Sequence, residues 1–215
     1  MSLIGHVTSS PVTPWHGALY TYVWAGNGVF IHGRRDHLEV RFQLSPAKVR
    51  GLEEVTELFE FKLPRVPVQI LQQLWTMARA QAIGNLEELY HLLWTDAGWE
   101  LVRPKQKQTS TTCRPLEDGP DSSHARAVIE IHSHHEMQPR FSRQDDADET
   151  GFRLYGVIGK VLSDPHIRLR VGLYGHFWEI PAGWVFELPG GLQDCVAYRM
   201  ENCVAITGGN NAEEV

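Results

Sequence analysis

Residues 126–149 read RAVIEIHSHHEMQPRFSRQDDADE. The apolar run Arg126–His132 predicts a β-strand, and the polar residues that follow predict a loop. Side chains alternate between the two faces of a strand, so His132 and His134 should project from one face while Ser133 points away. Two neutral imidazoles on one face are a ready pair of zinc ligands.

A catalytic zinc needs a third protein ligand and an open coordination position. The carboxylate of Asp145, in the loop that follows, can supply this ligand. A bare His-x-His is more often a pair of surface residues than a metal site, and Ser142-x-x-Asp145 alone is an ordinary helix capping box. The two interpretations of Asp145 are compatible, because a cap would hold its carboxylate rigidly.

The spacing resembles the motif of the JAMM/MPN zinc metallopeptidases. It reads His132-Ser133-His134, then residues 135–141, then Ser142, two residues and Asp145. The resemblance implies Zn²⁺ held by His132, His134 and Asp145, with Ser142 stabilising an oxyanion. It also implies hydrolysis of amide or isopeptide bonds behind the C-terminal tail of a ubiquitin-like protein.

The family also places a glutamate upstream, in a pattern similar to Glu-x-x-Gly-Leu-Leu. Residues 88–93 read ELYHLL and fit this pattern, except that His91 replaces the glycine. Glu88 is therefore the expected general base. Glu87 is its competitor, because only one of two successive residues in a strand can face the metal.

The N-terminal extension and the segment 151–159, GFRLYGVIG, resemble protein A of the bacterial PRTRC systems. Their gene clusters also encode ubiquitin-like, E1-like and E2-like proteins, so the resemblance implies a ubiquitin-like substrate and E1-like and E2-like partners. One departure concerns His135, which stands where many relatives have proline.

Outward from the motif, the sequence predicts an α+β (mixed α/β) domain with a central mixed sheet flanked by helices. The alternation and turn patterns predict elements on both sides of the motif. We expect a helix over 67–82, a hairpin over 88–102, a mobile loop over 105–123, a second hairpin from 153–162 and 166–174, and short strands at 176–180 and 184–188.

The N-terminal part carries its own strand pattern. Alternating residues over 18–24, 29–32 and 37–44 predict a small β module. We therefore expect a β module at 1–63, the catalytic domain at 64–207 and a flexible tail at 208–215.

Composition narrows the function classes. The 215 residues carry a net charge of −6, which gives no general attraction to nucleic acid or anionic membranes. No apolar run approaches the roughly 20 residues of a membrane helix, and no secretory signal is evident, so cytoplasmic localisation is expected. Three scattered cysteines leave histidine and carboxylates as the metal ligands.

Three other functions deserve comparison. His134-His135-Glu136 matches the His-x-Glu of nucleobase deaminases, but the Pro-Cys-x-x-Cys that completes their zinc site is missing. A metal-free MPN-like scaffold remains an alternative, which stoichiometric zinc would exclude. The other alternative is a peptidase that processes a sulfur-carrier-like protein for biosynthesis.

Overall fold

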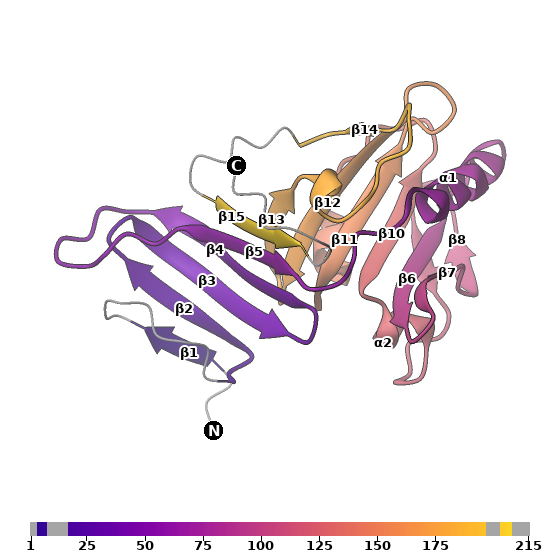
Figure 1. The fold of residues 1–215 in the computed structure, drawn as a ribbon. Coiled ribbons are helices and arrows are strands. Elements are labelled where there is room, and N and C mark those ends of the chain that lie inside the picture. The colour runs from indigo at the N-terminus through magenta and orange to yellow at the C-terminus, as the bar shows by residue number, and fades with distance from the viewer. Residues whose placement is uncertain (1–3, 8–16, 197–202, 208–215) are drawn as a thin grey trace. The chain divides into compact units, whose positions relative to one another are not determined.

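The computed structural model describes residues 4–7, 17–196 and 203–207. The chain divides into two compact units, one formed by residues 1–64 with 199–215 and the other by residues 65–198. Each unit is built around its own β-sheet (Figure 1).

The first unit holds a six-stranded sheet in the order β1-β2-β3-β4-β5-β15. Strands β2 to β5 form an antiparallel meander, while β1 and β15 pair in parallel with β2 and β5. The strands are β1 Ile4–Val7, β2 Tyr20–Ala25, β3 Gly28–Arg35, β4 Leu38–Pro46, β5 Glu57–Phe61 and β15 Cys203–Thr207. The strands expected over 18–24, 29–32 and 37–44 are confirmed as β2, β3 and β4.

The boundary drawn at the C-terminal end of the catalytic domain is wrong. Strand β15 pairs with β5, so the chain returns to the first unit after residue 198. Strand β5 itself lies within the charged stretch 48–62, where no strand was expected; there Phe59 and Phe61 are fully buried. The predicted tail at 208–215 lies outside the described residues.

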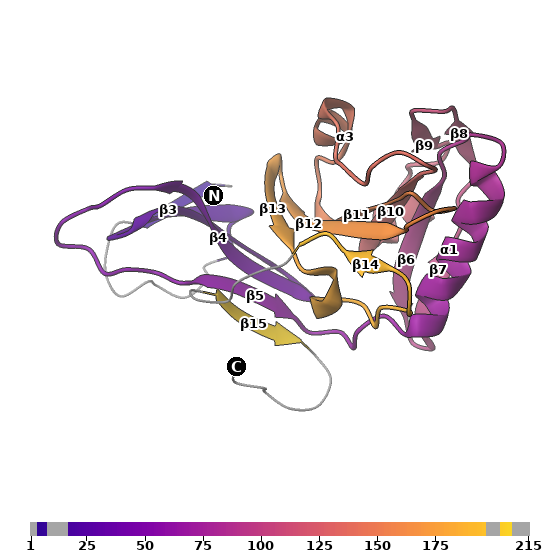
Figure 2. The ribbon, with the colours of Figure 1, turned by 90° about the horizontal axis from the view of Figure 1, so that it is seen from above.

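The second unit holds a seven-stranded mixed sheet in the order β13-β12-β11-β10-β6-β7, with β14 beside β12. Its central pair β10–β11 is parallel, and β6 pairs antiparallel with β10. Figure 2 shows that the sheet is strongly curled. The strands are β6 Leu89–Thr95, β7 Gly98–Val102, β10 Ile129–His134, β11 Phe152–Gly159, β12 His166–Leu173, β13 His176–Ile180 and β14 Gln193–Asp194.

Helix α1 (Val68–Ala82) lies beside this sheet (Figure 2) and confirms the helix expected over 67–82. Its N-cap is Pro67, whose fixed φ suits the start of a helix. Its buried face consists of residues at helical spacing, Leu71, Leu74, Ala78 and Ala82. Two short helices complete the unit, α2 (Ser123–Arg126) and α3 (Arg143–Asp148).

Two predictions for the second unit were wrong. The segment 105–123, expected to be a mobile loop, contains a two-stranded ladder of β8 (Gln106–Gln108) and β9 (Cys113–Pro115), followed by the start of α2. The strand expected at 184–188 is replaced by a 3₁₀ turn, Ala182–Trp184, and a single bridge between Phe186 and Val66. The unit is an α+β domain with few helices.

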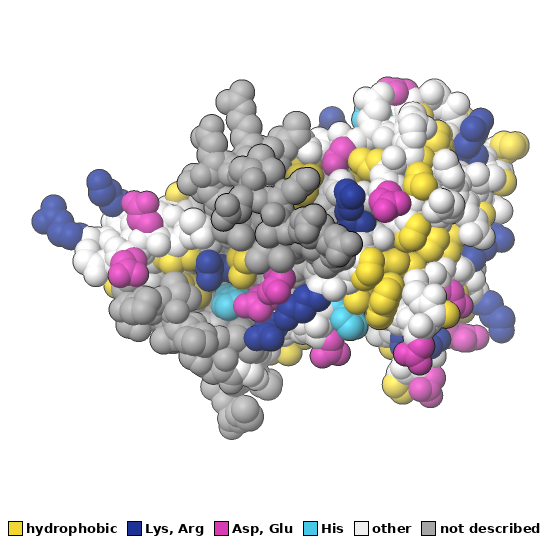
Figure 3. All heavy atoms as spheres, in the orientation of Figure 1, with side chains coloured by type: hydrophobic (Ala, Val, Ile, Leu, Met, Phe, Trp, Pro, Cys, Tyr) yellow, Lys and Arg dark blue, Asp and Glu magenta, His cyan; other side chains and the backbone are white. Residues whose placement is uncertain are grey.

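Within the part of the chain that is described, no helix is long and apolar enough to cross a membrane. On the face drawn in Figure 3, acidic and basic side chains are interspersed. Among the described residues of that face, no broad patch of one charge is seen.

Candidate metal centre

Strand register determines which side chains meet on one face of the second sheet. His132 of β10 pairs with Leu89 of β6, and Glu130 pairs with His91. Residues that pair directly across a sheet project to the same side. Glu130, His132 and His134 therefore line the same face as Leu89 and His91, whereas Ser133 faces the other way.

The structure brings His132, His134 and Asp145 together. The two Nε2 atoms lie 3.0 Å apart, and Nε2 of His132 lies 3.7 Å from Oδ1 of Asp145. The ligand atoms of the three residues all lie within 4.8 Å of one another. Both imidazoles are buried, at 6% and 8% exposure.

The donor set fits zinc. Nδ1 of His134 lies 3.0 Å from the carbonyl oxygen of Gln138, which can only accept a hydrogen bond. This contact places the proton on Nδ1 and leaves the Nε2 lone pair directed into the cluster, as in the outer shell of many zinc sites. Two imidazoles and one carboxylate are a common ligand set of catalytic zinc.

Burial keeps both imidazoles neutral, the form that binds metal. Burial, with the neighbouring His134, lowers the pKa of His132 to about 4, although the Asp145 carboxylate opposes this shift. Burial likewise lowers the pKa of His134, against the opposing effects of the Gln138 hydrogen bond and Asp145. We therefore expect both imidazoles to be neutral at pH 7 and able to bind a cation.

Asp145 is held by the N-terminal cap of α3. Its backbone N–H donates to Oγ of Ser142 at 3.2 Å, and the backbone N–H of Ser142 donates to Oδ2 of Asp145 at 2.5 Å. This reciprocal pair is a capping box. Because the cap uses Oδ2, Oδ1 is the oxygen turned toward His132.

Arg170 of β12 also holds α3 in place, through ion pairs with Asp146 and Glu149. It is only 4% exposed, its Nε donates to Oε2 of Glu149 at 2.8 Å, and its Nη1 donates to Oδ1 of Asp146 at 2.6 Å. Its guanidinium lies between the rings of Phe141 and Phe177, 3.8 and 3.7 Å from their centroids. Arg170 thus contacts Phe141, which precedes Asp145 in the sequence, and Asp146 and Glu149, which follow it.

The choice of Glu88 over Glu87 as the residue facing the cluster was wrong. Oε1 of Glu87 lies 3.7 Å from Nε2 of His134. Glu88 projects to the opposite face, where the Tyr90 hydroxyl donates to its carboxylate and Arg103 forms an ion pair with it. The pairing of β6 with β10 produces this outcome, since it sets Leu89, and hence Glu87, on the face of His132.

The carboxyl group of Glu87 has a raised pKa. Burial, together with the charge of Asp145, raises its pKa to about 8. A carboxyl group that titrates near neutral pH can both take up and release a proton there.

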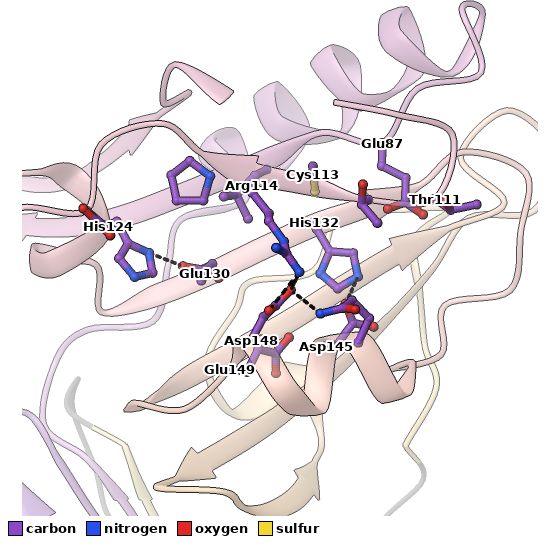
Figure 4. Close-up of a pocket in the computed structure, with 15 residues that line it drawn as sticks. Glu87, Thr111, Cys113, Arg114, His124, Glu130, His132, Asp145, Asp148 and Glu149 are labelled. Atoms are coloured by element: carbon purple, nitrogen blue, oxygen red, sulfur yellow. Dashed lines mark hydrogen bonds and ion pairs between the residues drawn. The ribbon is translucent and has the colours of Figure 1, made fainter. Parts of the chain in front are cut away.

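A pocket opens in front of the cluster (Figure 4). Glu87, His132 and Asp145 line one part of it, and Thr111 to Pro115 contribute a wall. Nη2 of Arg114, in that wall, donates to both carboxylate oxygens of Asp148 in α3, at 2.8 and 3.1 Å. The sequence interpretation missed this wall, because residues 105–123 were assigned to a loop.

The remaining predicted residues have clear positions. Ser142 is exposed at the start of α3, outside the residues that line the pocket. His135 turns away from the three ligands, with Nε2 3.0 Å from the carbonyl oxygen of Ser110. His91 is fully buried beneath α2, and its Nδ1 lies 2.8 Å from Oγ of Ser123.

Comparison with known proteins assigns no family: no protein-family model matches the chain, and no curated protein matches it. The geometry of the His132–His134–Asp145 cluster is therefore the main guide to function.

Proposed function

We propose that the chain is a zinc-dependent peptidase or isopeptidase that hydrolyses an amide bond behind the C-terminal tail of a ubiquitin-like protein. The observation that carries this proposal is the convergence of His132, His134 and Asp145, with Glu87 beside them and a pocket in front. Three ligands with an accessible side are the arrangement of a catalytic zinc site rather than a closed structural one.

Nε2 of His132, Nε2 of His134 and Oδ1 of Asp145 would hold the metal. When bound, zinc supplies Lewis acidity and makes water acidic enough to ionise near neutral pH. The capping box and Arg170 keep the carboxylate ligand in place, and the Gln138 carbonyl keeps His134 in the required tautomer.

Glu87 acts as the general base in this proposal. Its Oε1 accepts a proton from the attacking water and later delivers it to the nitrogen of the leaving amine. Its position suits this role, since Oε1 lies 3.7 Å from Nε2 of the proposed ligand His134 and the residue lines the pocket.

Ser142 remains the proposed oxyanion donor, although it lies at the start of α3 and outside the residues that line the pocket. Its Oγ accepts a hydrogen bond from the N–H of Asp145, so the hydroxyl proton stays available for donation to a substrate oxygen. The same contact fixes the position of Oγ relative to the ligand Asp145.

The substrate class follows from the resemblance to the JAMM/MPN peptidases. An extended tail would approach along the pocket, between the wall at Thr111–Pro115 and helix α3. E1-like and E2-like proteins are the proposed partners in the same conjugation system.

A cleavage assay tests the proposal. The full chain is incubated with a ubiquitin-like protein whose C-terminal tail is followed by a reporter peptide, with and without a zinc chelator. We expect release of the reporter, loss of cleavage with chelator and recovery on adding zinc. Cleavage that survives both the chelator and His132→Ala would contradict the mechanism. A chain that binds no zinc would instead favour the metal-free scaffold.

A further inference from the structure

A second group of metal-ligating side chains lies on the same face of the sheet, next to the first. It consists of His91 on β6, His124 on α2 and Glu130 on β10, whose ligand atoms all lie within 4.8 Å of one another. Figure 4 shows His124 and Glu130 at one end of the pocket, with His132 and Asp145 farther along it. The proposed hydrolase mechanism does not use this group.

The three side chains converge on one carboxylate oxygen. Oε2 of Glu130 lies 3.0 Å from Nδ1 of His124 and 3.5 Å from Nε2 of His91. The His91 imidazole is fully buried, and its Nε2 makes no hydrogen bond in the described part of the chain. Its 3.5 Å contact with Glu130 is long for a hydrogen bond, and a poorly satisfied buried nitrogen costs stability unless a ligand binds it.

The other nitrogen of His91 is already positioned. Nδ1 lies 2.8 Å from Oγ of Ser123, a hydroxyl that can accept a hydrogen bond from Nδ1–H. With the proton on Nδ1, Nε2 presents a lone pair toward Glu130. The same outer-shell arrangement holds His134 in the first cluster, through Gln138.

We infer that His91, His124 and Glu130 form a second binding site for a divalent transition metal, most simply Zn²⁺. Two imidazoles and one carboxylate are zinc's preferred nitrogen and oxygen donors. An ion can reach the site from the pocket, since His124 and Glu130 are among its lining residues. The inference goes beyond the proposed hydrolase and does not depend on it.

Among the described residues, Arg153 is the cation that contacts this site. Its Nη1 donates to the carbonyl oxygen of His124 at 2.7 Å and lies 3.5 Å from Oε2 of Glu130, a long contact for an ion pair. The pocket is also lined by Asp145, whose carboxylate favours a cation, whereas Asp148 and Glu149 are paired with Arg114 and Arg170. A bound metal would replace the contact between Arg153 and Glu130. The hydrogen bond from Arg153 to the His124 carbonyl oxygen would stay intact.

Zinc stoichiometry tests the inference. The full chain is stripped with a chelator, loaded with zinc, desalted and measured by mass spectrometry of the metal. We expect two zinc ions per wild-type chain and one in His124→Gln, a conservative change at a side chain that is 32% exposed. Asp145→Asn should also retain one, and the double variant should retain none.

Matched controls separate the two sites. His166→Gln removes a histidine outside both clusters and should leave two zinc ions bound. One zinc ion in the wild type, lost in Asp145→Asn and kept in His124→Gln, would overturn the second site and leave a structural ion-pair network. One zinc ion lost only in His124→Gln would instead remove support from the proposed hydrolase. A wild-type chain that retains no zinc would refute the second site without any variant, so the test survives a variant that fails to fold.

Discussion

Oε1 of Glu87 lies 3.7 Å from Nε2 of His134, although the two residues are 47 positions apart in the sequence. The contact arises because β6 and β10 are neighbours with His132 opposite Leu89. It places a carboxyl group beside the three candidate ligands. The two adjacent glutamates therefore have different surroundings. Glu87 lies at the site, and Glu88 lies on the opposite face of the sheet.

The pair Glu87→Gln and Glu88→Gln tests that separation. We expect Glu87→Gln to keep its zinc and to lower turnover by about 10²–10⁴-fold, because an amide cannot accept the proton. Glu88→Gln should leave turnover nearly unchanged. It should lower the free energy of unfolding by roughly 1–3 kcal/mol, because the charged contact with Arg103 is lost. The reverse pattern in steady-state kinetics would return the catalytic role to Glu88.

Arg170 is predicted to position the metal ligand Asp145. Arg170→Met removes its contacts to Asp146 and Glu149 while retaining much of the apolar volume. We expect zinc affinity to fall about 10–100-fold, measured by competition with a chelator, because α3 is no longer fixed. Arg143→Ala, an exposed change on the same helix, is the matched control. Equal affinities in the two variants would show that α3 needs no support from β12.

The stability of the metal-free protein should depend on pH through His132. Its pKa is about 4 when folded, against an ordinary value near 6.5 for an unfolded chain. Between these values the unfolded chain binds the proton and the folded chain does not, so stability falls as pH drops from about 6.5 toward 4. Urea unfolding of the chelator-treated protein should show this loss, with a shallower slope in His132→Asn. Identical slopes would mean that the imidazole is not shielded.

The second unit should carry the metal centre by itself. All three candidate ligands and Glu87 lie between residues 65 and 198, and His32 of the first unit is 2.9 Å from Glu39. A chain limited to residues 65–198 is expected to bind zinc as tightly as the full chain, measured by the same competition assay. Circular dichroism must first show that it folds. Loss of zinc from a folded fragment would implicate the first unit in the site.

Local patterns predicted much of the fold. Alternating apolar residues identified β2, β3, β4 and the hairpin of β11 with β12, and helical spacing identified α1. The cluster of His132, His134 and Asp145 was also predicted, from the shared strand face of the two histidines together with the resemblance to the JAMM/MPN motif.

Long-range pairing decided what local patterns could not. Periodicity predicts that only one of Glu87 and Glu88 faces the metal, but the register with β10 selects which one. The return of β15 to β5 joins segments more than 140 residues apart. The polar segment 105–123 is ordered by contacts outside itself, including the hydrogen bond from Gln108 to the carbonyl oxygen of Glu87.

Anomalous X-ray diffraction at the zinc edge tests the metal centre most directly. Crystals of the full chain grown with zinc should show an anomalous peak about 2.0–2.2 Å from Nε2 of His132, Nε2 of His134 and an oxygen of Asp145. The Glu87 carboxylate should lie beside that peak without ligating it. A zinc-loaded crystal with no peak among these three residues, or with Glu87 filling the remaining coordination position, would contradict a hydrolytic metal centre.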